Sequence, residues 1–265
     1  MAKAKKSARK LSAREQLEAA LEHQRAGRFD RAQQICEQLL ARTPKLAPAH
    51  AILGALALSR GAPEAALASL DRAIALEHGH VGAHLNRGNA LRALGRDAEA
   101  AQAYRTALAL DGSSAFAHNN LANLLRDHGR LDEAIASYER ALALDPGLYA
   151  AAANLASVLA GRAASPGSEP ASRERAIEAH ERALAIAGAR GLRDLSVATC
   201  HNTLGNLLLA AGRTADALAS YRRAIELDPA FGEAHLNLGA LLARPGSVED
   251  ALTHLRRGRE LTPDY

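Results

Sequence analysis

Residues 115–148 read AFAHNNLANLLRDHGRLDEAIASYERALALDPGL, and this stretch decides the fold. Its apolar residues recur at spacings of three and four, in one run over 121–125 and a second over 134–142. That spacing is the period of an amphipathic helix. Between the runs, Gly129 is expected to stop the first helix and Asp132 to cap the second. The stretch therefore predicts two antiparallel helices joined by a short turn.

The same pattern returns every 34 residues. The segment Ala-Leu-Ala-Leu-Asp ends at Asp111 and again at Asp145, and Asp-Pro at 145–146 and 228–229 ends a second helix, because proline cannot continue one. Aligned on such marks, the chain divides into seven units: 13–46, 47–80, 81–114, 115–148, 149–190, 198–231 and 232–265. The unit 149–190 is longer than the others and is expected to hold an inserted loop at 161–172, and a second insertion falls around 190–197. One hairpin cannot bury its apolar face alone, so stacked hairpins are expected to share a continuous core.

Composition and charge exclude several classes of protein. Roughly a quarter of the residues are alanine, which favours helix, and aromatic residues make up only 3%. Two cysteines cannot build a disulfide framework, and no apolar run approaches the length of a membrane span. The net charge of +4 comes from Lys3, Lys5, Lys6, Arg9 and Lys10, so the rest of the chain is close to neutral. Residues 1–12 are expected to be a basic disordered tail, and nucleic acid is disfavoured as a partner.

The repeat resembles the tetratricopeptide repeat (TPR) family. The unit 115–148 supplies the family's pattern with Leu121-Ala122, Leu125, Ala134, Tyr138, Ala141 and Pro146. Departures include His78 and Gly112 where the family has proline, and histidine where it often has tryptophan. The resemblance implies an all-α fold, a right-handed superhelical solenoid of seven TPR hairpins whose first helices line a concave groove.

Asparagine recurs at the positions expected to face that groove. The candidate binding residues are two rows of asparagine, their neighbours and two arginines: Asn86, Asn120, Asn154 and Asn237 in the first row, Asn89, Asn123 and Asn206 in the second, Asn119 and Asn202 beside the first, and Arg92 and Arg126. Asparagine is a poor residue within a helix, so its recurrence calls for a reason. A carboxamide both donates and accepts, which suits the backbone of an extended peptide. The alternative, hydrogen bonds within the scaffold, stays open for both rows.

The first row is similar to the asparagine ladder of the superhelices that precede O-GlcNAc-transferase-type glycosyltransferases, where it holds substrate polypeptide by its main chain. The array as a whole is most similar to those that precede O-GlcNAc-transferase-type or sulfotransferase domains in bacterial proteins. The lysines and arginines of the co-chaperone clamp for acidic C-termini are not matched, because Leu85, Asn119 and Ala153 occupy those positions. The arginines Arg92 and Arg126 are expected to be solvated or to add a mild preference for acidic ligands.

No catalytic, metal or cofactor site is expected. The histidines His50, His84, His118, His201 and His235 share one repeat position, too far apart for a common zinc ion, and are interpreted as packing residues. Cys36 is expected to be a small buried group. Cys200 is placed at the opening of a first helix, where a thiolate could be stabilised, but no catalytic constellation accompanies it.

Two functions remain in view. The first is a cytoplasmic, bacterial, non-enzymatic scaffold that binds a protein or peptide segment in its Asn-lined groove. The second is the substrate-recruiting N-terminal array of a larger enzyme (a glycosyltransferase, sulfotransferase or methyltransferase), of which the chain would be a truncated or fragmentary form. Self-association through an uncapped C-terminal repeat is a further expectation.

Overall fold

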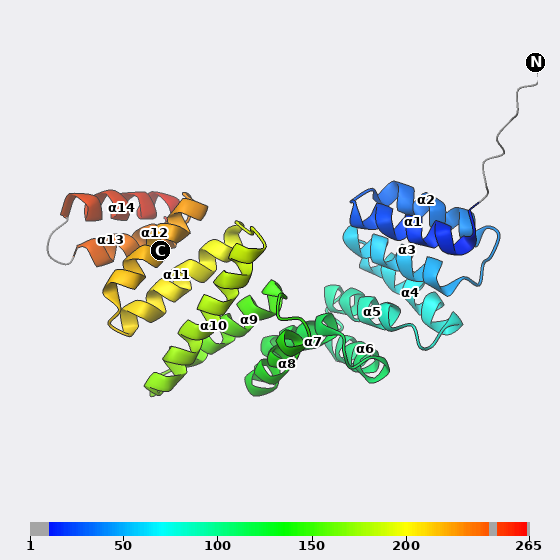
Figure 1. Ribbon diagram of the computed structural model, residues 1–265, viewed down its shortest axis with the longest axis horizontal. Helices are drawn as coiled ribbons and strands as arrows, with labels where there is room; N and C mark the ends of the chain where they lie inside the picture. The colour runs from blue at the N-terminus through cyan, green and yellow to red at the C-terminus, as the bar shows by residue number, and fades with distance from the viewer. Residues whose placement is uncertain (1–10, 244–247, 264–265) are drawn as a thin grey trace, which may run out of the picture. The chain divides into compact units, whose positions relative to one another are not determined.

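The computed structural model describes residues 11–243 and 248–263. Over these residues it contains fourteen α-helices and no strand, which confirms the predicted all-α class (Figure 1). Their bounds are α1 Ala13–Arg25, α2 Phe29–Leu40, α3 Ala47–Ser59, α4 Pro63–Leu76, α5 Val81–Ala93, α6 Asp97–Leu110, α7 Ala115–Asp127, α8 Leu131–Leu144, α9 Tyr149–Ala163, α10 Pro170–Ala189, α11 Leu195–Ala210, α12 Thr214–Leu227, α13 Gly232–Leu242 and α14 Val248–Leu261. The chain forms two compact units, one up to Leu124 and the other from Leu125.

In the first unit, odd-numbered and even-numbered helices alternate as the two arms of hairpins. The helices α1 and α2, α3 and α4, and α5 and α6 pack together, and each pair also contacts the next. The connections within these pairs span three residues each, with a glycine at positive φ in the middle: Gly27, Gly61 and Gly95. Glycine adopts this left-handed conformation without the steric cost of a Cβ, so the pattern explains the tight reversals.

The second unit continues the alternation with one irregular hairpin. The pairs α9 and α10, α11 and α12, and α13 and α14 pack together, and Gly129 and Gly212 occupy the same left-handed turn position as in the first unit. Gly129 therefore stops α7 as predicted, but Asp132 does not cap α8: Arg130 is the N-cap residue and contributes no side-chain hydrogen bond. The second helices α8 and α12 end at Leu144 and Leu227, directly before the predicted Asp-Pro stops.

The inserted residues lengthen helices more than they lengthen the loop. The expected loop 161–172 is wrong at both ends, because α9 continues through Ala163 and α10 begins at Pro170. The helix α10 is 20 residues long, against 14 for α8 and α12. The second insertion also becomes helix, since α11 begins at Leu195, where the Asp194 side chain accepts hydrogen bonds from the Ser196 and Val197 amides. Helical continuation keeps the backbone polar groups of the inserted residues paired.

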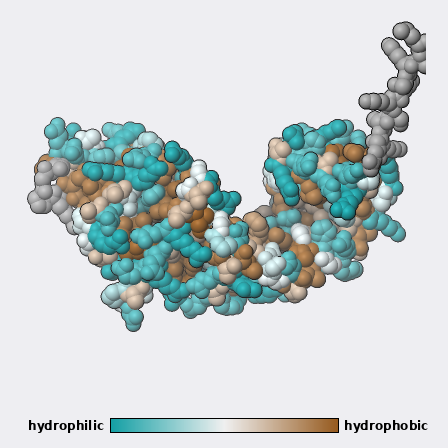
Figure 2. Space-filling model, in the orientation of Figure 1, coloured by the Kyte–Doolittle hydropathy of each residue, from teal (hydrophilic) through white to brown (hydrophobic). Residues whose placement is uncertain are grey.

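Small residues and buried tyrosines build the core. Gly88 on α5 lies against Tyr104 on α6, and a Cβ on this glycine would come within 2.4 Å of the ring. Gly205 and Tyr221 repeat the arrangement on α11 and α12. Both rings are about 1% exposed, so the hairpins close around them. The visible surface of each unit carries hydrophilic residues with apolar ones interspersed (Figure 2).

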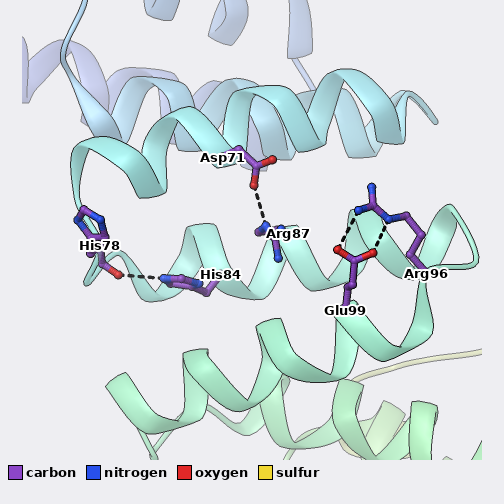
Figure 3. A network of polar contacts seen from close by, with 6 residues as sticks. All are labelled: Asp71, His78, His84, Arg87, Arg96 and Glu99. Carbon is purple, nitrogen blue, oxygen red and sulfur yellow. Dashed lines mark hydrogen bonds and ion pairs between the residues drawn. The ribbon is translucent and has the colours of Figure 1, made fainter.

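Exposed ion pairs in the first unit form both between neighbouring hairpins and within one hairpin. Arg87 on α5 pairs with Asp71 on α4 at 2.7 Å, and Arg96 makes two hydrogen bonds of 2.8 Å to Glu99 at the start of α6 (Figure 3). Exposed pairs of this kind contribute on the order of 0–1 kcal/mol each, so the core accounts for most of the stability.

The expected basic tail lies almost entirely outside the described residues. Within its range, only Leu11 and Ser12 are described. Ser12 belongs to the helix, because its hydroxyl accepts a hydrogen bond from the Glu15 amide and the Glu15 carboxylate accepts one from the Ser12 amide. This reciprocal capping box fixes the beginning of α1 at Ala13.

Candidate functional site

The second Asn row is tied to the buried tyrosines in both units. In the first unit, the Tyr104 hydroxyl donates to Asn89 Oδ1 at 2.9 Å. In the second, the Tyr221 hydroxyl donates to Asn206 Oδ1 at 2.7 Å. Burial raises the pKa of Tyr104 to about 12, so its hydroxyl keeps its proton and remains a donor at neutral pH. The second-row amides are therefore held in a fixed orientation by the helix behind them.

The sequence contains a signal for this pairing that the 34-residue period alone does not reveal. Tyrosine at the core position of a second helix always accompanies asparagine fifteen residues earlier: Tyr104 with Asn89, Tyr138 with Asn123, and Tyr221 with Asn206. Where another residue replaces the tyrosine, the asparagine is also replaced, as in Leu70 with Ala55 and, across the inserted residues of the irregular unit, His180 with Ser157. A donor in the core and an acceptor on the first helix occur together because each satisfies the other.

The first Asn row makes hydrogen bonds between neighbouring first helices. In the first unit, Asn120 Nδ2 on α7 donates to Asn89 Oδ1 on α5 at 2.8 Å, while Asn120 Oδ1 accepts from Asn119 Nδ2 at 3.1 Å. Asn86 lies one turn before Asn89 and is a distant acceptor for it, at 3.5 Å. Asn119 is buried, and its Oδ1 atom has no hydrogen-bond partner among the described residues.

The second unit repeats this cross-linking. Asn237 Nδ2 on α13 donates to Asn202 Oδ1 on α11 at 3.0 Å, and Asn202 is 4% exposed. Arg126 Nη1, near the end of α7, donates to Asn154 Oδ1 on α9 at 3.3 Å and also pairs with Asp127. Arg126 is therefore bonded within the scaffold, with 33% of its side chain still exposed to solvent. Arg92 and Asn123 are half-buried and also take part in interactions within the chain.

A cavity opens between α9 and α11 in the second unit. It has a volume of about 650 Å³ and is lined by small and polar residues of α9, the 164–169 connection and α11, among them Ser157, Ser168, Thr203 and Asn206, with Arg173 of α10. A neighbouring cavity of about 390 Å³ shares Ser157 and Thr203 with it and extends to Asn154, Leu195 and Cys200. Two predicted site residues, Asn154 and Asn206, therefore line two adjacent cavities.

The repeated histidine anchors the start of four first helices, α3, α5, α7 and α13. The ring Nε2 of His84 lies 2.9 Å from the carbonyl oxygen of His78, six residues earlier (Figure 3). His50, His118 and His235 make the same contact with Pro44, Gly112 and Pro229, at 3.0, 3.3 and 3.1 Å. The carbonyl always belongs to the residue at the family's proline position. The predicted packing role is thus a specific hydrogen bond.

His201 is the exception among these histidines. It is the seventh residue of α11, whereas the others are the fourth residue of their helices, so the residue six positions earlier is the helical Leu195. Its Nδ1 is buried with no partner among the described residues. Burial, aided by Arg223, lowers the pKa of His201. The second insertion therefore removed the turn carbonyl that this histidine position normally uses.

Both cysteines are buried and poorly suited to react. Burial raises the pKa of Cys36 to about 11 and that of Cys200 to about 12. Cys200 is the sixth residue of α11, so the expectation that it opens a first helix is wrong. A neutral buried thiol is a weak nucleophile. Over the described residues there is no group of three or more histidine, cysteine or acidic side chains that could hold a metal ion.

None of the helices over the described ranges has both the length and the apolar character needed to cross a bilayer. The last helix, α14, exposes Val248 and Leu252 by 67% and 45%. Self-association through the C-terminal repeat stays a prediction.

The helix pairs, their left-handed glycine turns and the small residues facing bulky ones define a helix-hairpin repeat protein. Comparison with family models gives the family. Four tetratricopeptide repeat models match, over residues 17–76 and 202–265, 115–148, 173–230, and 88–125. The chain belongs to the tetratricopeptide repeat family. No curated protein sequence matches the chain.

Solved structures show the same fold. The chain is similar to PilF of Pseudomonas aeruginosa, with a TM-score of 0.69, 18% identity and coverage of 84% of this chain and 94% of that one. It is similar to YrrB, described as a TPR protein with an unusual peptide-binding site, with a TM-score of 0.60, 23% identity and coverage of 74% and 93%. It also matches the APC/C hetero-tetramer Cut9–Hcn1, with a TM-score of 0.68, 16% identity, and coverage of 93% of this chain but 46% of that one. Repeats of this family mediate protein interactions, and this supports a protein-interaction scaffold.

Proposed function

We propose that this scaffold binds an extended polypeptide through the first-row asparagines, reading its backbone more than its side chains. The proposal rests on the observation that hydrogen bonds within the chain already hold these side-chain amides in one orientation. Asn120 is held by Asn89 and Asn119, and Asn154 is held by Arg126. An amide fixed before binding loses little rotamer entropy when a ligand arrives.

The scaffold bonds leave hydrogen-bonding capacity for a ligand. Each carboxamide has two N–H donors and an oxygen with two acceptor positions. In Asn120, the hydrogen bonds to Asn89 and Asn119 use one donor and one acceptor position. In Asn237, the bond to Asn202 uses one donor. Both residues are half-buried, so the remaining positions are near solvent. A peptide backbone, which also offers one donor and one acceptor per residue, matches them.

Because the hydroxyls of Tyr104 and Tyr221 donate to the second asparagine row, the two rows have different roles in this proposal. Asn89 supports Asn120 from behind, since its oxygen accepts from the buried Tyr104 hydroxyl and from the Asn120 amide. The first row binds the backbone of the ligand. The alternative proposal, that the array recruits substrate for a larger enzyme, rests on the resemblance of the first row alone and predicts the same residues.

The test uses a display library of random nonapeptides and the full chain. Peptides selected on the wild type are measured by fluorescence anisotropy against the double variant Asn120→Ala, Asn154→Ala. The matched control is Gln38→Ala, Gln102→Ala, which removes two exposed amides from the second helices α2 and α6. With about 1 kcal/mol lost per hydrogen bond, the asparagine variant should bind roughly tenfold more weakly or worse, while the control stays within about twofold. Equal binding by both variants, or a library with no enriched peptide, would contradict the proposal.

A further inference from the structure

Arg173 is a cation without a counter-ion beside a cavity. It lies in the first turn of α10, is half-buried and lines the larger hollow between α9 and α11. Its guanidinium makes no hydrogen bond or ion pair with any residue in the described part of the chain. Nearby arginines behave differently: Arg162 pairs with Asp132, and Arg175 pairs with Glu139. A guanidinium carries five donors, and the donors of Arg173 are left for solvent or a ligand in the hollow.

The walls of this hollow add donors and no negative charge. No aspartate or glutamate lines it. The hydroxyls of Ser157 and Thr203 make no hydrogen bond with any described residue. The oxygen of Asn206 is taken by Tyr221, which leaves the Nδ2 group as the free end of that amide. The hollow thus collects one positive charge, two hydroxyls and an amide donor.

Small residues leave the space open. Ala160, Gly161 and Ala164 form one wall, and Gly167 in the connection adopts a φ of 80°, which reverses the chain there. The connection itself is held against α9, because the Ser168 hydroxyl donates to the Ala163 carbonyl at 2.6 Å. The volume of about 650 Å³ falls within the range typical of ligand sites.

We propose that this hollow takes the carboxylate side chain of an acidic residue in the bound polypeptide. The inference rests on the proposed function and adds a side-chain preference to it. Arg173 supplies the fork of donors that matches a carboxylate in bidentate fashion, and Asn206 and the two hydroxyls donate to the remaining positions. The site is specific to the irregular hairpin, because the inserted residues supply both the connection and the first turns of α10.

The experiment follows the side chain of Arg173 directly in the full chain. Arginine Nε–Hε resonances are recorded by NMR while N-acetyl-L-glutamic acid amide is titrated in, and the isosteric N-acetyl-L-glutamine amide is the neutral control. The Arg173 resonance, assigned from its absence in Arg173→Gln, should shift saturably with the glutamate compound and at least tenfold more weakly with the glutamine compound. The backbone amide of Asn206 should shift in parallel, and this shift should disappear in Arg173→Gln and persist, weakened, in Arg173→Lys.

Arg193→Gln is the matched control, because it removes the same charge from an exposed arginine in the same unit that does not line the hollow. It should leave the Asn206 shift unchanged. The proposal is overturned if the Arg173 and Arg193 resonances shift alike without saturation, or if the glutamine compound binds equally well.

The two proposals fail in different ways. If selected nonapeptides depend on Asn120 and Asn154 but show no preference for glutamate over glutamine, only the carboxylate site is wrong. If the glutamate compound saturates the Arg173 resonance but no nonapeptide is enriched, polypeptide binding is wrong, and with it the proposal that the carboxylate belongs to a polypeptide.

Discussion

The hairpin α5–α6 of the first unit and the hairpin α9–α10 of the second share one repeat pattern but differ in how they close. In α5–α6, helices of 13 and 14 residues are joined by a three-residue turn around Gly95. Tyr104 fills the space behind Gly88 and donates outward to Asn89. The Tyr104 side chain therefore connects the hydrophobic core of the hairpin with the surface of its first helix, α5.

In α9–α10, helices of 15 and 20 residues are joined by residues 164–169. His180 replaces the tyrosine and is 2% exposed, and its Nδ1 lies 2.8 Å from the Ala176 carbonyl oxygen of its own helix. Ser157 occupies the position of the second-row asparagine. It lines the hollow and makes no hydrogen bond to any tyrosine that the structure describes. The imidazole of His180 faces inward, and its Nδ1 contacts a backbone carbonyl of α10 instead of a side chain on the first helix.

The difference shows where a repeat array can change. Each hairpin contacts its neighbours only, so an insertion in one affects local contacts and leaves the others intact. The regular hairpin pairs its polar groups within itself and with the neighbouring helices α4 and α7. The irregular one leaves a cation, two hydroxyls and an amide donor beside an open volume, and it is here that we place side-chain recognition.

The strongest test of this comparison removes the tyrosine of the regular hairpin. Tyr104→Ala should lower the free energy of unfolding by about 3–5 kcal/mol, because it empties a fully buried aromatic site. Tyr104→Phe should cost only about 1 kcal/mol, since Asn89 Oδ1 still accepts from Asn120. Urea unfolding followed by circular dichroism measures both. Similar losses in the two variants would show that the hydroxyl bond, and not the volume of the ring, holds the hairpin closed.

Replacing a glycine with alanine should change the free energy of unfolding in opposite directions in the two hairpins. Both changes should be smaller than that of Tyr104→Ala. Gly88→Ala places a Cβ 2.4 Å from the Tyr104 ring, and this overpacking should destabilise the chain by about 1–3 kcal/mol. Gly188→Ala on α10 meets no heavy atom within 4 Å and should stabilise by up to about 1 kcal/mol through helix propensity. Thermal unfolding of the two variants provides the measurement. A stabilising Gly88→Ala would mean that the ring can move aside, against the close packing described for α5–α6.

The sequence was sufficient for the fold wherever periodicity and turn residues agreed. Gly129 and the Asp-Pro pairs mark ends that the structure has at the same places. It failed at the insertions, because Gly161 and Pro170 suggest a loop, while Gly161 continues α9 and Pro170 is accepted in the first turn of α10. For the candidate site, the repeat spacing predicts which asparagines lie on the same helix face. It does not predict which neighbouring side chain forms a hydrogen bond with each of them. Arg173 carries no repeat signal, since it directly follows the inserted loop and its counterpart in the unit 115–148 is Leu131, so only the structure reveals it.

The smallest expected effect concerns the histidine position, compared between a regular helix start and the one that follows the irregular hairpin. His84→Leu loses the hydrogen bond to the His78 carbonyl and should cost about 0.5–1.5 kcal/mol. His201→Leu replaces a ring whose buried nitrogen has no partner among the described residues, so it should be neutral or stabilising. The pKa of His201 is lowered in the folded state, so the unfolded chain binds more protons as the pH falls through about 6.5, and folding stability decreases there. Urea midpoints measured at pH 7.5 and pH 5 should therefore differ less in His201→Leu than in the wild type. An unchanged difference, or equal losses in the two variants at pH 7.5, would mean that the extra residues at the start of α11 did not deprive His201 of its partner.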